Sequence, residues 1–171
     1  MIITSWNIRG LKSRGKQRYL NDRLKKDKPS IMIVQETKIS TEKMRDILNR
    51  NTNRYEMMGQ DAIGSAGGLV IIWNPEEIQI DNWISFPRIL TRTAKIIGTV
   101  EEVIITGVYG PHTQRERENF LQNLKAMRTL ITDKPWILGG DFNLIKSLAE
   151  KRGGLRRMDI AMEQFGDMIR E

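Results

Sequence analysis

The sequence predicts a mixed α/β (α+β) domain in which sheets pack on each other with helices outside them. Three observations lead to this fold class. Short apolar, β-branched runs recur along the chain, helical signals fall between some of these runs, and in the middle of the chain four or five strands follow one another without a helix. Strands that follow one another directly pair as antiparallel hairpins, which favours layered sheets over a doubly wound parallel sheet.

Seven runs have the composition of strands, and four segments carry helical signals. The predicted strands are 2–6, 30–34, 67–73, 76–84, 92–98, 103–109 and 135–139. The clearest helix begins where Thr113 and Glu116 have the spacing of a capping box. Four apolar residues then follow at helical spacing: Phe120, Leu124, Met127 and Ile131. Weaker helix signals cover 16–26, 41–50 and 158–170.

The composition indicates one globular domain. The 171 residues fit a single compact domain, and the 39% of apolar residues is too high for a disordered chain. The absence of cysteine excludes disulfides, thiolate zinc sites and cysteine nucleophiles. No basic leader and no long apolar run is visible, so we expect an intracellular protein with no membrane contact.

The positive charge is concentrated near the start of the chain. Residues 9–28 hold nine basic side chains against Asp22 and Asp27. This surplus of seven equals the net charge of the whole chain, +7, so the remainder of the chain is neutral. Such a segment attracts phosphate backbones, and an ordinary solvated loop and helix face is the alternative. The predicted nucleic-acid contacts are the basic residues that follow the first strand: Arg9, Lys12, Arg14 and Lys16.

Polar residues at four strand ends predict a single site. Asn7, Glu36, Tyr109 and Asp141 each follow or end an apolar run, and Asn143 comes two positions after Asp141. Each residue alone has an ordinary explanation as a turn or core residue. On extended backbone, however, side chains at i and i+2 share a face, so Asp141 and Asn143 would point into the same space. Amide and carboxylate oxygens from several strand ends are ligands of the kind that Mg²⁺ prefers.

Five motifs carry a resemblance to a known family. "WNIRG", "QET", "GGLVIIW", "VYGP" and "GGDFN" occur in an order and approximate spacing that resemble the endonuclease/exonuclease/phosphatase family, which includes DNase I and the apurinic endonucleases. The residues of these motifs are similar to those in the endonuclease domain of plant long-interspersed-element (LINE) retrotransposons, which also have an "EKRGG"-like loop. The resemblance covers essentially the whole chain. It implies a four-layer α/β/β/α sandwich of the DNase I type, here missing its C-terminal strands.

The resemblance also implies a role for each site residue. Glu36 and Asn7 would hold Mg²⁺, or Mn²⁺ in its place. Tyr109 would hydrogen-bond the scissile phosphate, Asp141 would orient and deprotonate the attacking water, and Asn143 would donate to the phosphoryl oxygens. The implied activity is a Mg²⁺-dependent nick in DNA. A chain acting on chromosomal DNA would be nuclear.

One part of the family pattern is missing. Relatives have a Ser-Asp-His near the C-terminus, whereas the one histidine here, His112, follows "VYGP" and is expected to have a local role. We therefore expect a single domain, 1–171, that is truncated at the C-terminus and weakly active or inactive. The complete family domain is a monomer, and a truncated one could self-associate. Two alternatives stay open: a remnant that only binds nucleic acid, and a phosphatase or phosphodiesterase acting on another phosphate ester.

Overall fold

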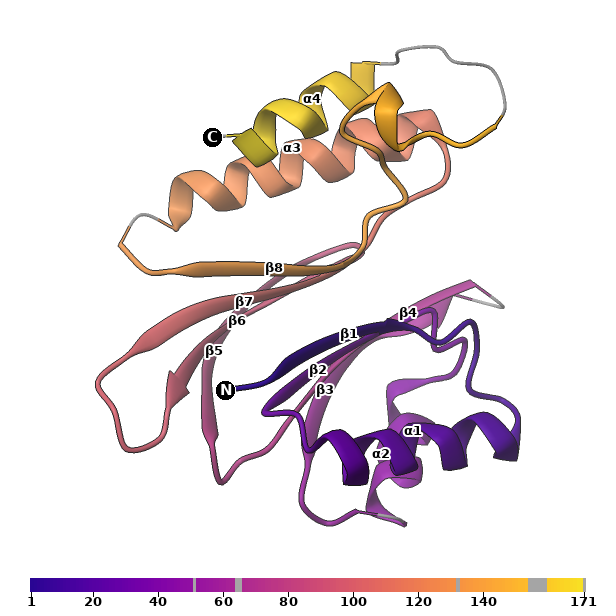
Figure 1. The fold of residues 1–171 in the computed structure, drawn as a ribbon, viewed down its shortest axis with the longest axis vertical. Coiled ribbons are helices and arrows are strands. Elements are labelled where there is room, and N and C mark those ends of the chain that lie inside the picture. Colours follow the sequence, from indigo (N-terminus) through magenta and orange to yellow (C-terminus); the bar gives the residue numbers. More distant parts are fainter. Residues whose placement is uncertain (51, 64–65, 132, 154–159, 171) are drawn as a thin grey trace. The chain divides into compact units, whose positions relative to one another are not determined.

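A computed structural model describes residues 1–50, 52–63, 66–131, 133–153 and 160–170. Within these residues the chain forms two sheets, four α-helices and one short 3-10 helix (Figure 1). It divides into two compact units, Met1–Tyr109 with Asp133–Asp141, and Gly110–Thr132 with Phe142–Glu171. The first unit contains both sheets, and the second contains the C-terminal helices.

The first sheet has the strand order β1-β2-β4-β3. Its strands are β1 (Ile3–Asn7), β2 (Ile31–Gln35), β3 (Glu56–Ile63) and β4 (Ala66–Trp73). β1 and β2 are parallel, with Asn7 opposite Gln35, whereas β4 is antiparallel to both β2 and β3. The helix between β1 and β2 allows the parallel pairing, because parallel neighbours need a crossover.

The second sheet has the strand order β5-β6-β7-β8. Its strands are β5 (Ile78–Phe86), β6 (Ile89–Ile96), β7 (Glu102–Tyr109) and β8 (Trp136–Asp141). β5, β6 and β7 form an antiparallel meander, as the uninterrupted succession of strands predicts. β8 runs parallel to β7 and places Asp141 opposite Tyr109.

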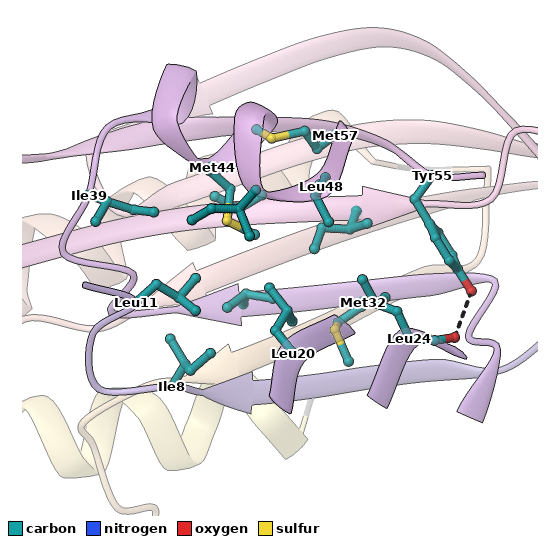
Figure 2. Packing of buried hydrophobic residues seen from close by; sticks show 14 residues of the cluster. Ile8, Leu11, Leu20, Leu24, Met32, Ile39, Met44, Leu48, Tyr55 and Met57 are labelled. Carbon is teal, nitrogen blue, oxygen red and sulfur yellow. Dashed lines mark hydrogen bonds between the residues drawn. The ribbon is translucent and has the colours of Figure 1, made fainter. Parts of the chain in front are cut away.

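Helices α1 (Arg14–Asp27) and α2 (Thr41–Asn49) cover one face of the first sheet. Both begin at a serine N-cap, Ser13 and Ser40, whose side chain accepts a backbone N–H of the first turn. Figure 2 shows the core between helices and sheet. Its apolar residues come from α1, α2 and the helix-facing side of the strands, among them Leu20, Leu24, Met32, Met44, Leu48 and Met57.

The opposite face of the first sheet packs against the second sheet. The side chains alternate along β2, so that Ile31 and Ile33 enter this second core while Met32 and Val34 face the helices. The sheets approach closely where Gly107 and Gly139 lie over Ile33. A Cβ on these glycines would lie 2.9 Å and 3.1 Å from Ile33 side-chain carbons. The first unit thus has three layers, helices, sheet and sheet.

The second unit is helical. Helices α3 (Gln114–Leu130) and α4 (Ile160–Arg170) pack on each other, and a 3-10 turn, Leu148–Glu150, lies between them in sequence. Phe142 contacts Phe165 of α4 with ring centroids 5.1 Å apart.

The predicted capping box at the start of α3 is wrong in detail. Thr113 is the N-cap, but its hydroxyl donates to the Glu116 carboxylate at 2.7 Å and makes no bond to a backbone N–H. The residues chosen from sequence therefore interact, although through a different hydrogen bond.

The predicted fold class is confirmed, since the chain is a mixed α/β protein with two sheets and four helices in the described ranges. All seven predicted strands are present, and β3 is an eighth that the sequence did not predict. The predicted helix 158–170 is found as α4 from Ile160, and positions 158 and 159 lie outside the described residues. None of the described helices is long and apolar enough to cross a membrane.

Candidate active site

Four predicted site residues lie at strand ends that the topology brings to one place. Asn7 is the last residue of β1, and Glu36 directly follows β2, the parallel neighbour of β1. Tyr109 and Asp141 are the last residues of β7 and β8 and are register partners in the second sheet. The carboxyl ends of parallel neighbours lie at the same edge of a sheet, so each sheet contributes one pair of functional groups.

Two hydrogen bonds join these pairs from sheet to sheet. Asn7 Nδ2 donates to Asp141 Oδ2 at 2.7 Å, across 134 positions of sequence. The Tyr109 hydroxyl donates to Glu36 Oε1 at 3.1 Å. Both contacts lie inside the first unit. The four side chains that the sequence identified separately therefore form one cluster.

Glu36 is held in an unusual backbone conformation. Its φ of 59° lies in the left-handed region, which costs free energy for a residue with a side chain. Neighbouring backbone fixes it there: Gly10 N donates to Glu36 O at 2.7 Å, and Leu11 N donates to Thr37 O at 2.8 Å. On the other side, Thr37 N donates to Gly68 O at 3.3 Å. The loop after β2 is thus fixed between the loop after β1 and the beginning of β4.

Tyr109 is almost fully buried, with 4% of its surface exposed. Burial, together with the hydrogen bond to Glu36 and the negative charge of Glu36, raises the pKa of Tyr109 to about 12. The Arg88 guanidinium lies 5.6 Å from the centre of the ring and acts in the opposite direction. The hydroxyl is therefore protonated at neutral pH and acts as a hydrogen-bond donor.

Two residues that the sequence did not identify support Tyr109. Arg88 has a φ of 68°, and its carbonyl accepts a hydrogen bond from Tyr109 N at 3.0 Å. Gln60 of β3 then holds this turn: its Oε1 accepts from Arg88 N at 3.0 Å, and its Nε2 donates to two further carbonyls, Phe86 O and Ile89 O. Gln60 could not be identified from the sequence, because no strand was predicted in the segment that forms β3.

Lys38 is a third residue that the sequence did not single out. Its ammonium lies 3.5 Å from Glu36 Oε1, and its stem packs along Gly10. Its place directly after "QET" was the only available signal. A cation at this distance neutralises part of the Glu36 charge and adds positive potential beside the cluster.

The predicted nucleic-acid contacts follow the end of β1 in the chain. Arg9, Lys12, Arg14 and Lys16 are all exposed in the loop after β1 and the first turn of α1. Lys16 also has a structural contact, because its Nζ donates to Ile8 O at 2.8 Å and to Arg9 O at 2.7 Å. It therefore holds the loop that follows Asn7 while keeping its charge.

Asn143 does not lie on extended backbone, so the i, i+2 argument for it was wrong. The strand ends at Asp141, and Asn143 has a φ of 51°. Asn143 belongs to the second unit, where its Nδ2 donates to Gly110 O at 2.7 Å and its carbonyl accepts from Arg117 at 3.2 Å. His112 is exposed just before α3 in the same unit.

The glycines of "GGDFN" have a packing role in the structure. Gly139 faces Ile33 of the other sheet, and a Cβ on Gly140 would lie 2.0 Å from Val108 O. A side chain at either position would therefore clash inside the sheets.

The cluster offers oxygen ligands only. Asn7 Oδ1 accepts from Arg9 N at 3.1 Å, and as a carbonyl oxygen it has a second lone pair for a cation. With the carboxylates of Glu36 and Asp141, this set fits Mg²⁺, which usually takes one or two protein carboxylates and keeps several waters. In the part of the chain that the structure describes, no three His, Cys, Asp or Glu residues gather into a metal-binding group.

The fold and the cluster together define a class of protein, a two-sheet α/β domain with carboxylate, amide and phenol groups at adjoining strand ends. The sequence matches the endonuclease/exonuclease/phosphatase family over residues 4–167, and the chain belongs to this family. No curated protein matches the sequence.

Solved structures share the fold at low sequence identity. TDP2 of D. rerio complexed with a single-strand DNA product is 18% identical, with a TM-score of 0.62 over 82% of this chain and 60% of that chain. The human Nocturnin catalytic domain is 17% identical, with a TM-score of 0.61 over 81% of this chain and 62% of that one. A Bacteroides thetaiotaomicron mannosyl-6-phosphatase is 14% identical, with a TM-score of 0.69 over 96% of this chain and 69% of that chain. The chain thus spans roughly two thirds or less of the TDP2 and Nocturnin chains.

Proposed function

We propose that this chain is the endonuclease domain of a LINE-type retrotransposon and hydrolyses one phosphodiester bond in DNA with the help of Mg²⁺. The observation that carries the proposal is the cluster at the four strand ends, in which Asn7 binds Asp141 and Tyr109 binds Glu36. The family is generally dependent on a divalent metal ion. The basic loop beside Asn7 favours a polyanionic substrate over a small phosphate ester.

Each residue has a defined task in the proposed reaction. Asp141 accepts a proton from the attacking water, and Asn7 holds the carboxylate in place through its hydrogen bond. Water adds to phosphorus, the bond from phosphorus to the 3′ oxygen breaks, and that oxygen takes a proton from solvent, leaving a 3′-hydroxyl. Tyr109 would turn its one hydroxyl proton from Glu36 to a phosphoryl oxygen as the charge there grows. The role proposed for Asn143, a further donor to those oxygens, rests on the resemblance of "GGDFN" to the family motif.

Glu36 and Asn7 are the proposed metal-binding residues. The ion, when bound, neutralises charge on a phosphoryl oxygen. Lys38 lies against the same carboxylate and would add positive charge beside the phosphate. The sequence contains a single histidine, His112, so we expect a low rate from these 171 residues alone. The proposed site of action is nuclear DNA.

A plasmid-nicking assay with Mg²⁺ tests this function. Asp141→Asn should lower the nicking rate about 100- to 10,000-fold, as loss of a general base does. Glu36→Ala should abolish the response to Mg²⁺. Asp133→Asn and Glu42→Ala make the same chemical changes at exposed positions of the described chain and should leave the rate unchanged.

The outcomes separate the proposal from its alternatives. Nicks that a DNA polymerase extends, and that both site variants abolish, support the endonuclease. Binding of DNA without nicking would identify a remnant that only binds nucleic acid. Release of phosphate from a small ester at a higher rate than nicking would identify a phosphatase.

A further inference from the structure

Two aromatic rings form a pair beside the end of β1. Trp6 of β1 and Tyr19 of α1 lie edge to face, with ring centroids 5.2 Å apart and an interplanar angle of 67°. Trp6 is partly buried and packs on the core beneath α1 and α2. Tyr19 is 53% exposed. Trp6 therefore holds the Tyr19 ring in place, and about half of Tyr19 remains exposed to water.

Charged side chains of both signs flank the exposed ring. Lys16 stands three positions before Tyr19, Asp22 and Arg23 stand three and four positions after it on the same side of the helix, and Lys26 follows Arg23 one turn later. Lys16 keeps its charge while bonding two backbone carbonyls. Arg23 pairs with Asp27 at 2.8 Å, so this part of the face is neutralised. An aromatic ring among lysines differs from a purely solvated helix face, because it combines a stacking surface with an attraction for phosphate.

The face borders the candidate active site. Trp6 directly precedes Asn7 in β1, and the two side chains point to opposite faces of the strand. β1 is an edge strand of the first sheet, so the aromatic pair is not covered by a further strand of that sheet. A polymer bound at the strand ends could thus continue past this edge onto α1.

We propose that Tyr19, supported by Trp6, is a stacking platform for an unpaired base of a single-stranded nucleic acid whose phosphates bind Lys16 and Lys26. This inference rests on the proposed function, because it concerns the same substrate beyond the cleaved bond. A base in a duplex is already stacked and paired, so its face is not available to Tyr19. The platform would therefore favour frayed or single-stranded DNA over intact duplex at the same phosphate charge.

Equilibrium binding without metal tests the platform separately from catalysis. Fluorescence anisotropy with a labelled single strand of about 12 nucleotides, in EDTA, gives the dissociation constant. Tyr19→Ala should weaken binding about 5- to 100-fold, whereas Tyr19→Phe keeps the ring and should stay within about twofold. Lys26→Gln should lower the slope of log K against log salt by about 0.7.

Two controls distinguish stacking from general damage. Val100→Ala shortens another exposed apolar residue, one that stands beside Glu101 and Glu102, and should not change binding. On a duplex of equal length, Tyr19→Ala should change the affinity less than about twofold. Circular dichroism of each variant checks the fold.

The platform is overturned if the chain does not bind the single strand, if Tyr19→Ala binds it as the wild type does, or if duplex and single strand lose equal affinity. Failure of the nicking assay would leave this outcome unaffected, because the binding measurement contains no metal. Tyr19-dependent binding without nicking would support the platform and contradict the proposed catalysis.

Discussion

Asn7 and Asp141, 134 positions apart, are joined by a 2.7 Å hydrogen bond from the amide to the carboxylate. The same amide accepts from Arg9 N through its oxygen. One side chain thus connects the carboxylate at the end of β8 to the basic loop after β1. It fixes the orientation of Asp141 and presents an amide oxygen beside it.

Asn7→Ala should weaken the response to metal more than the fold. The change removes an oxygen ligand and leaves Asp141 without this donor. Loss of a partner that orients a metal ligand typically lowers metal affinity about 10- to 100-fold. The Mg²⁺ concentration that half-saturates nicking, and the Mg²⁺-dependent rise in Tm, should both shift accordingly. Asn119→Ala, at an exposed position of α3, is the control. An unchanged Mg²⁺ dependence in Asn7→Ala would remove Asn7 from the proposed metal site.

Gly68→Ala should destabilise the contact between the beginning of β4 and the loop that contains Glu36. A Cβ on Gly68 would lie 2.1 Å from Thr37 Oγ1, and its φ of +88° is unfavourable for alanine. We expect a loss of at least about 2 kcal/mol in the free energy of unfolding, measured by urea denaturation. Gly98→Ala is matched in φ, at +84°, but meets no atom within 4 Å, and it should cost only about 1 kcal/mol. Equal losses in both variants would show that the contact with Thr37 relaxes freely.

The strand ends could be predicted from sequence because the signal is local. Apolar runs followed by Asn7, Glu36, Tyr109 and Asp141 identify both the strands and the residues that follow them. The parallel pairs that bring these ends together follow from a helix between each pair of strands. The hydrogen bonds between sheets were not predictable, since they depend on how closely the two sheets pack.

The features that were missed depend on distant partners. β3 has the sequence "EMMGQDAI", which has few β-branched residues, and it becomes a strand through pairing with β4. The glycine pair before Asp141 is required by Ile33 and Val108, which are distant in sequence. Arg88 supports Tyr109 from a turn between two strands, and no local pattern relates them.

Lys16→Met should both destabilise the chain and weaken DNA binding. Its hydrogen bonds to Ile8 O and Arg9 O are charge-assisted, but the first is only part-buried and the second is exposed, so we expect a loss of about 1 kcal/mol in the free energy of unfolding. If Lys16 also neutralises a phosphate, the salt slope of duplex binding should fall by about 0.9. Lys12→Met should give the same change in slope with no loss of stability. Equal stability of the two variants would contradict the structural role of Lys16.

Glu77 should make the stability depend on pH in acid. Its carboxylate accepts from Ser30 Oγ at 2.6 Å and from Asn74 Nδ2 at 2.7 Å, and these bonds, that of Ser30 first, hold its pKa below the ordinary 4.5. The folded state therefore binds this proton less readily than the unfolded state. The stabilisation is complete above the ordinary pKa and is lost as the pH falls through the lowered one. Glu77→Gln should be less stable than wild type at neutral pH, and the difference should shrink toward about pH 2.

Urea denaturation at a series of pH values measures this difference in stability, with Glu76→Gln as the control for losing one negative charge at the adjacent position. A constant difference between Glu77→Gln and wild type from neutral to acid pH would show that the hydrogen bonds do not depend on the charge of Glu77.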